Sequence, residues 1–178
     1  IIDNLNQIKL AKANHDKVIC IIHGGHEYHH LPSPRMVKQY RFYAENGADA
    51  IVGHHTHCIG GYEVYNNVPI IYSLGNFLFT LPSIHEKWYT GLLLELNINK
   101  KMPITFKLIP VQQEKETFRC NLVNERESKN ILQKVKDYSE ILQNEIELNK
   151  SWNAFIDKMR DQYLNFYSPI QFFNNRYI

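Results

Sequence analysis

Histidines gather at two places in this chain, each directly after a short run of apolar residues. The first group follows residues 18–22 and the second follows residues 48–52 (His23, His26, His29 and His30; His54, His55 and His57). Neutral imidazole binds zinc, manganese and iron, so these residue types indicate metal chemistry. The pair His55 and His57 has a spacing that lets both rings approach one ion, although histidines also satisfy hydrogen bonds in loops and cores.

The two apolar runs read as buried strands, and a helix is predicted between them. Ser33 and Pro34 form a typical helix start, and Gly47 is a typical stop. A strand, a helix and a second strand usually form a right-handed crossover between parallel strands, whose carboxyl ends lie along one edge of the sheet. We therefore expect His23 to lie within reach of the same ion as His55 and His57. The alternative is an ordinary α/β domain in which the histidines only make hydrogen bonds.

Short elements are predicted on both sides of this unit. A helix is expected from residue 3 or 4 to Asn14, a hairpin with an Asn66-Asn67 turn after the second strand, and two paired strands later (62–65 with 68–72; 89–98 with 104–111). Gly75 is expected to adopt a backbone conformation that other residues resist. The following Asn76 then either reaches the site through its amide or caps the turn.

The chain from Ser128 onwards has the spacing of amphipathic helices, with an expected break at residues 149–151. Beyond the break, aromatic and aliphatic residues recur every three or four positions as far as Pro169 (Trp152, Phe155, Ile156, Met159, Tyr163 and Phe166). Such a stripe indicates a packing face, with a partner-binding face as the alternative. We expect residues 1–120 to form one domain and residues 121–178 to form a helical extension packed on it or appended to it.

Composition excludes some classes of partner. Twenty Lys and Arg residues nearly balance eighteen Asp and Glu residues, so no nucleic-acid partner is expected. Three cysteines at unrelated spacings indicate neither a disulfide framework nor a cysteine zinc site. No apolar run approaches the roughly 20 residues that span a bilayer, so membrane contact is expected only through a segment not present here.

Three blocks together resemble the second half of the CapA family, in that family's order (His23–Tyr28, Asn46–His57 and Val68–Phe77). Members of this family are linked to bacterial capsule and poly-γ-glutamate synthesis, and their domain is similar to calcineurin-like metallophosphoesterases. The resemblance implies a mixed α/β fold, namely the C-terminal half of a metallophosphoesterase-like αββα sandwich followed by the helical extension. Gly24 departs from the family, because many members have a bulky aromatic residue there, which leaves the shape of the pocket near His23 open.

The resemblance also implies roles for single residues. His23, His55 and His57 match metal ligands, and the metals implied are divalent Mn, Fe or Zn in a two-metal site. His54 is expected to orient another group or carry a proton. For Glu27 the roles of ligand, general acid or base, and plain loop carboxylate stay open. His26, His29 and His30 are expected to be solvated loop residues, with a role in covering the site as the alternative.

A two-metal site also needs a bridging carboxylate, since two divalent ions repel each other without an anionic ligand between them. The family places this carboxylate, an Asp-x-His or similar strand end and an Asn-His pair upstream of the histidine blocks. Residues 1–22 hold only Asp3, Asp16, His15 and three asparagines, none after a core strand. The missing ligands are therefore expected upstream of Ile1, and this chain alone is expected to be inactive.

Two functions stay open at this point. The first is metal-dependent hydrolysis of a phosphoester or of amide bonds in an envelope polymer, with an anionic polymer or phosphoester as substrate. The second is a non-catalytic assembly or transport factor that works with the capsule synthesis machinery. The family implies a bacterial cell-envelope or extracytoplasmic location, and the residues leave a cytoplasmic one open.

Overall fold

The computed structural model describes residues 2–80 and 83–167, with side chains as far as residue 160. The elements are, in chain order, α1 (Ile2–Asn14), β1 (Ile19–His23), α2 (Pro34–Glu45), β2 (Ala50–His54), β3 (Tyr62–Tyr65), β4 (Val68–Ile71), the 3-10 helix η1 (Glu86–Tyr89), β5 (Thr90–Asn97), β6 (Thr105–Gln113), β7 (Cys120–Leu122), α3 (Glu125–Leu142) and α4 (Glu145–Tyr167). The expected mixed α/β class is confirmed.

The first sheet has the strand order β1-β2-β4-β3. β1 and β2 are parallel, and their register pairs His23 with His54 at the carboxyl end. β4 is parallel to β2, and the hairpin partner β3 is antiparallel to β4. The predicted strand-helix-strand unit is therefore confirmed, and both groups of histidines begin at the same edge of the sheet.

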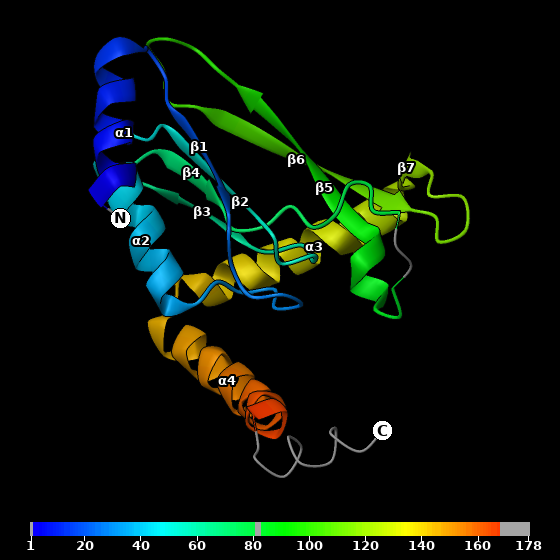
Figure 1. The fold of residues 1–178 in the computed structure, drawn as a ribbon. Coiled ribbons are helices and arrows are strands. Elements are labelled where there is room, and N and C mark those ends of the chain that lie inside the picture. Colours follow the sequence, from blue (N-terminus) through cyan, green and yellow to red (C-terminus); the bar gives the residue numbers. More distant parts are fainter. Residues whose placement is uncertain (1, 81–82, 168–178) are drawn as a thin grey trace.

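Helices α1 and α2 cover one face of this sheet (Figure 1). Ile8 of α1 and three residues of α2 are buried in the same core cluster as Ile51 and Ile70 of the sheet (Val37, Tyr40 and Tyr43). The Ser33 hydroxyl accepts a hydrogen bond from the Met36 amide at 3.2 Å, which caps α2 as the sequence predicts. This packing fixes the direction in which the loop between β1 and α2 leaves the sheet.

The second sheet is antiparallel, with the order β5-β6-β7. It joins the first through a bridge between Gly75 and Gly91 and through the Leu92 amide, which donates to the Leu74 carbonyl oxygen. Helix α3 packs against it with Ile131 and Val135. The sequence did not predict β7 or η1, because three or four residues are too few to show a periodicity.

The predicted break at residues 149–151 is wrong. The helices separate at Gln143 and Asn144, and the Asn144 side chain accepts hydrogen bonds from the amides of Ile146 and Glu147. Asn149 lies inside α4, where its side chain bonds back to the Glu145 carbonyl oxygen. The part of the expected helix beyond Tyr167, and the side chains of Tyr163 and Phe166, lie outside the described residues. None of the described helices combines the length and the apolar character that crossing a bilayer requires.

Candidate metal centre

The orientation of the His57 ring is fixed by a chain of two hydrogen bonds. The Asn76 side-chain amide donates to the Trp88 carbonyl oxygen at 3.0 Å, which leaves the Asn76 Oδ1 atom facing His57. That oxygen is an acceptor and lies 2.9 Å from His57 Nδ1, so the network assigns the ring proton to Nδ1. The lone pair of the ring is therefore on Nε2.

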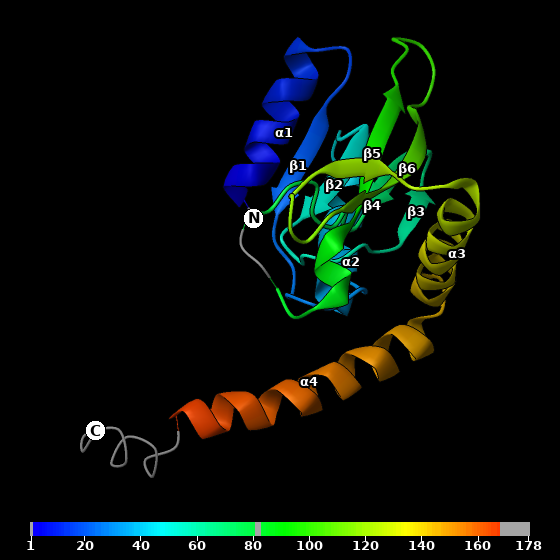
Figure 2. The same ribbon diagram turned by 90° about the vertical axis from the view of Figure 1, so that its right-hand side faces the viewer.

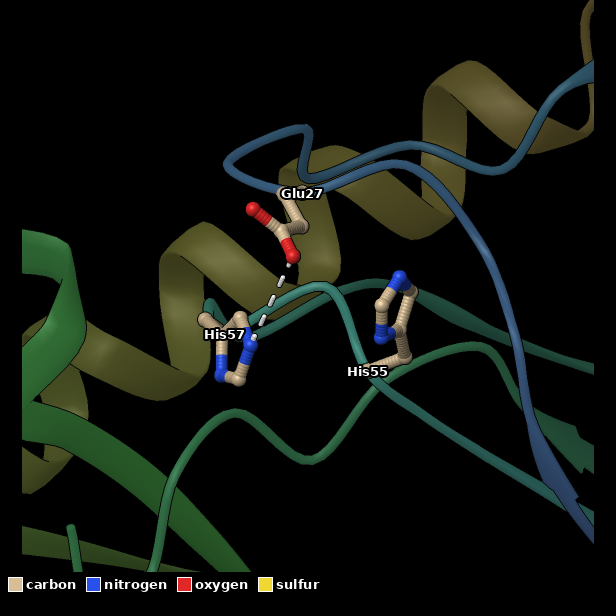
Figure 3. A group of neighbouring side chains, drawn as sticks. All are labelled: Glu27, His55 and His57. Atoms are coloured by element: carbon tan, nitrogen blue, oxygen red, sulfur yellow. Dashed lines mark ion pairs between the residues drawn. The ribbon is translucent and has the colours of Figure 1, made fainter.

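The Nε2 atom of His57 points toward the carboxylate of Glu27, at 4.0 Å from Oε1 (Figure 3). This distance is too long for a hydrogen bond. A donor atom of His55 completes a group of three, all within 4.8 Å of one another. Two ligands held at about 2.1 Å from one ion lie about 3.0 to 4.2 Å apart, so small rotations of these side chains would seat a single ion.

His23 lies beside this group rather than inside it. Its Nε2 atom is 3.1 Å from Nδ1 of His55, and the two ring centroids are 4.8 Å apart. The contact is a hydrogen bond when one of the two nitrogens carries a proton. With both nitrogens deprotonated, the same distance suits two ligands at about a right angle around one ion. The donors are nitrogen and oxygen, a set that suits Mn, Fe or Zn.

The backbone of the second histidine group is strained. His55 has a φ of 98° and His57 a φ of 58°, both in the region that side chains other than glycine rarely adopt. Thr56 between them is buried, donates to the Cys58 carbonyl oxygen and shares a hydrogen bond with the Ser73 hydroxyl. These hydrogen bonds of Thr56 hold the turn in place despite the positive φ values on either side. Such backbone strain is typical of sites where function dictates side-chain positions.

The loop after β1 is tied to the same threonine. The Tyr28 amide donates to the Thr56 carbonyl oxygen at 2.8 Å, next to Glu27. Gly25 has a φ of 134°, and a Cβ atom there would lie 2.8 Å from the Thr56 Cγ2 atom. Only glycine therefore allows the two loops to approach closely enough for Glu27 to face His57.

His54 ends β2 and is half-buried. Burial lowers the pKa of this histidine, and the neighbouring His23 lowers it further. The ring is therefore neutral at pH 7 and able to accept a proton. It is not part of the group formed by Glu27, His55 and His57.

The expectation that His26, His29 and His30 are solvated is wrong for two of them. His26 is exposed, but its ring lies 4.7 Å from that of Trp152. His29 is stacked on Phe155, and burial lowers its pKa to about 4. His30 is stacked on Tyr138, and its Nδ1 atom donates to the Ile59 carbonyl oxygen at 2.6 Å. The helices α3 and α4 cover this loop, which the sequence of the loop itself does not reveal.

Sequence reasoning missed two residues beside His57. Trp88 of η1 stacks on the His57 ring with centroids 4.5 Å apart, and Phe79 meets it edge-on at 5.4 Å. Both are single aromatic residues in irregular segments, and no spacing in the sequence relates them to the histidines. Asn76 was expected either to reach the site or to cap a turn, and the structure shows its contact with His57.

Comparison with known proteins adds to this geometry. The family described as "Bacterial capsule synthesis protein PGA_cap" matches residues 3–81. The chain is 44% identical over 79 residues to the capsule biosynthesis protein CapA of Bacillus anthracis, a match that covers 42% of this chain and 19% of that protein. It is 46% identical over 72 residues to the PGA biosynthesis protein CapA of Bacillus subtilis, covering 40% of this chain and 19% of that protein.

All the grouped histidines, Glu27 and Asn76 fall inside the matched segment, whereas sheet β5-β6-β7 and the helices α3 and α4 fall outside it. The matched segment spans about a fifth of the length of these relatives. Residues 3–81 are therefore similar to the bacterial capsule synthesis family and to the CapA proteins.

Proposed function

We propose that this chain supplies His55, His57 and Glu27, with His23 beside them, to a divalent-metal site of a capsule or poly-γ-glutamate biosynthesis protein. The proposed reaction is metal-assisted hydrolysis of a phosphoester or of amide bonds in an anionic envelope polymer. The proposed site of action is the cell envelope, in keeping with the capsule biosynthesis proteins among the relatives.

The observation that carries the proposal is the orientation of His57. Asn76 accepts a hydrogen bond from Nδ1 of that ring, so in the neutral imidazole the lone pair on Nε2 is aimed at the carboxylate of Glu27. Metal-binding histidines typically donate their other ring nitrogen to an oxygen acceptor in this way.

The chemistry follows from the donor set. A bound divalent ion lowers the pKa of water and polarises a phosphoryl or carbonyl oxygen. The Glu27 side chain is 52% exposed, so it can change position and accept a proton as well as serve as a ligand. His54 is the neutral base on the neighbouring strand end, and its proposed role is to orient a group or carry a proton.

The proposed two-metal site needs further ligands in addition to Glu27, His23, His55 and His57. β1 is an edge strand among the described strands, and Ile21 on it is 73% exposed. Ile21 and His23 lie on the same exposed face of β1, and this apolar face and the unpaired strand edge are places where further chain can pack. On this proposal Glu27, His55 and His57, with His23 beside them, bind one ion, and a second ion binds only where those further ligands are supplied.

Titration with Mn²⁺ and Zn²⁺ tests the site. We expect the chain to bind one ion, and the double variant His55→Ala, His57→Ala to bind it at least about 100-fold more weakly, because two of the donors are lost. His15→Ala is the matched control, since His15 is exposed at the end of α1, and its affinity should not change. Equal affinity in the double variant would rule out the ligand assignment.

A second experiment separates hydrolysis from the alternative, a non-catalytic assembly or transport factor. The full-length protein is tested for turnover of an aryl phosphodiester and of poly-γ-glutamate. Turnover that disappears in the double histidine variant is the expected result. Metal binding without turnover of either substrate would favour the assembly factor.

A further inference from the structure

Two aromatic side chains of α4 lie against the loop that carries Glu27. The ring of Trp152 is 4.7 Å from His26, and the ring of Phe155 is 4.3 Å from His29, at an interplanar angle of 21°. Trp152 and Phe155 also stack on each other, with centroids 5.5 Å apart. Residues on both sides of Glu27 therefore rest on a helix more than 120 positions later in the sequence.

This platform is fixed relative to the rest of the molecule. Leu148, one turn before Trp152, is 4% exposed and belongs to the core cluster between α1, α2 and the first sheet. The Asn144 side chain caps the start of the same helix. Figure 2 shows that α4 runs beneath the body of the molecule, on the side of α3 and α2. The aromatic pair is thus held by the core and not by the loop it touches.

Contacts on the other side of Glu27 come from different elements. The Tyr28 amide bonds to the Thr56 carbonyl oxygen, and the Tyr28 ring lies 4.4 Å from His85 and 6.1 Å from Trp88. Glu27 therefore lies between the α4 platform and the aromatic group beside His57. The loop needs both supports, because no hydrogen bond joins the Glu27 carboxylate to another described residue, so the backbone that carries Glu27 limits where the carboxylate can lie.

We propose that Trp152 and Phe155 are positioning residues, which hold the loop of residues 24–30 so that the Glu27 carboxylate faces His57. The effect on metal affinity rests on the proposed metal site, whereas the effect on the loop does not. Both aromatic residues lie outside residues 3–81, the segment that the family matches. A helix from the unmatched C-terminal part of the chain therefore supports a loop of the matched segment.

Amide hydrogen exchange of the chain, resolved by NMR, measures the loop directly. In the double variant Trp152→Ala, Phe155→Ala we expect protection of the Tyr28 amide to fall at least about 10-fold, while the amides of Ile51 and Val52 in β2 keep theirs. Ile156→Ala is the control on the same helix, because Ile156 is 43% exposed, and it should leave Tyr28 unchanged. The conservative variant Trp152→Phe, Phe155→Tyr should restore protection.

Mn²⁺ titration of the same variants supplies the second measurement. We expect affinity to fall about 10-fold in the alanine variant and to recover in the conservative one, as for other residues that support a ligand from behind. Unchanged Tyr28 protection in the alanine variant would overturn the proposal. If protection falls in β2 as well, the single variant Phe155→Ala is measured at the same amides. A fall at Tyr28 without a fall at Ile51 and Val52 supports the proposal, and unchanged protection at Tyr28 overturns it. Absence of Mn²⁺ binding by the unmodified chain would count against the proposed function, and the exchange result would still decide on the positioning.

Discussion

Two clusters of charged and polar side chains lie on this fold, and they differ in how their atoms are satisfied. One joins Arg41 of α2, Glu63 of β3 and Tyr72. The other joins Glu27, His55 and His57 at the carboxyl edge of the first sheet. The first is closed upon itself, and the second has donor atoms that face each other without a hydrogen bond.

In the closed cluster, Arg41 holds Glu63 through three nitrogen–oxygen contacts of 2.7 to 3.2 Å. The Tyr72 hydroxyl donates to the same carboxylate at 2.6 Å, and burial together with the Glu63 charge raises the pKa of Tyr72. The Glu63 side chain is 8% exposed. Both carboxylate oxygens of Glu63 accept hydrogen bonds from the protein. The cluster therefore contributes to the fold and leaves no unpaired acceptor for a ligand.

In the open cluster, the closest approach of His57 Nε2 to Glu27 is 4.0 Å, on a strained backbone and with Glu27 half-exposed. Polar residue types alone therefore do not identify a site. A site is indicated where the lone pairs of several side chains face one another, and where hydrogen bonds to other residues fix the orientation of those side chains. Mutations in the two clusters should accordingly affect different quantities.

The largest expected effect on stability comes from opening the closed cluster. Arg41→Ala leaves the buried Glu63 carboxylate without its cation, so we expect the free energy of unfolding to fall by about 3 kcal/mol. Urea denaturation measures it, with Lys38→Ala on an exposed position of α2 as the control. Affinity for Mn²⁺ should stay the same. A loss of metal affinity with intact stability would break the distinction between the two clusters.

The next effect concerns the open cluster. Asn76→Ala removes the acceptor that keeps the proton of His57 on Nδ1, so we expect Mn²⁺ and Zn²⁺ to bind about 10- to 100-fold more weakly. Calorimetric titration measures the change. Asn121→Ala is the control, because that exposed amide bonds to Glu114 far from the histidines in sequence and leaves His57 untouched. Unchanged affinity in Asn76→Ala would show that the amide only caps its turn.

A smaller effect is expected when one hydrogen bond is removed and the ion pair is kept. Tyr72→Phe should lower the free energy of unfolding by about 1.5 kcal/mol, since the lost bond is made to a charged, buried acceptor. Tyr65→Phe removes a similar bond to Glu45 at an exposed position, and we expect a clearly smaller loss of stability there. An equal fall in the free energy of unfolding in both variants would mean that burial does not decide how much each hydrogen bond stabilises the fold.

The smallest effect concerns pH. Burial lowers the pKa of His30, the charges of Lys87 and Lys134 lower it further, and the hydrogen bond to Ile59 raises it in part. The unfolded chain therefore binds a proton at His30 more readily than the folded chain, and stability falls as the pH drops below about 6.5. In His30→Gln the free energy of unfolding should fall less steeply as the pH decreases. Urea denaturation between pH 7.5 and 5 measures it, and identical slopes would contradict the assignment.

Much of the fold was predictable because the signals were local. Ser33 and Pro34 mark the start of α2, and the Asn66-Asn67 turn marks the hairpin, where both residues have positive φ. The apolar runs before His23 and His54 predicted parallel strands with a common edge. The end of α3 was predicted wrongly, because Asn144 and Asn149 look alike in sequence and only the former caps a helix.

The candidate site was predictable only where residue type and strand position coincide, as for His55 and His57. Glu27 could not be separated from a plain loop carboxylate, because its approach to His57 depends on the contact between Gly25 and Thr56. The helical spacing marked Trp152 and Phe155 as packing residues, but the sequence does not show that they, or Trp88, pack beside the site. Their discovery required the three-dimensional arrangement.

The most direct test of the central claim is anomalous diffraction at the zinc edge from crystals of this chain grown with Zn²⁺. We expect a peak about 2.1 Å from His57 Nε2, with Glu27 and His55 as further ligands and Asn76 still bonded to Nδ1. A zinc ion bound elsewhere, with His57 and Glu27 in their present separate positions, would contradict it.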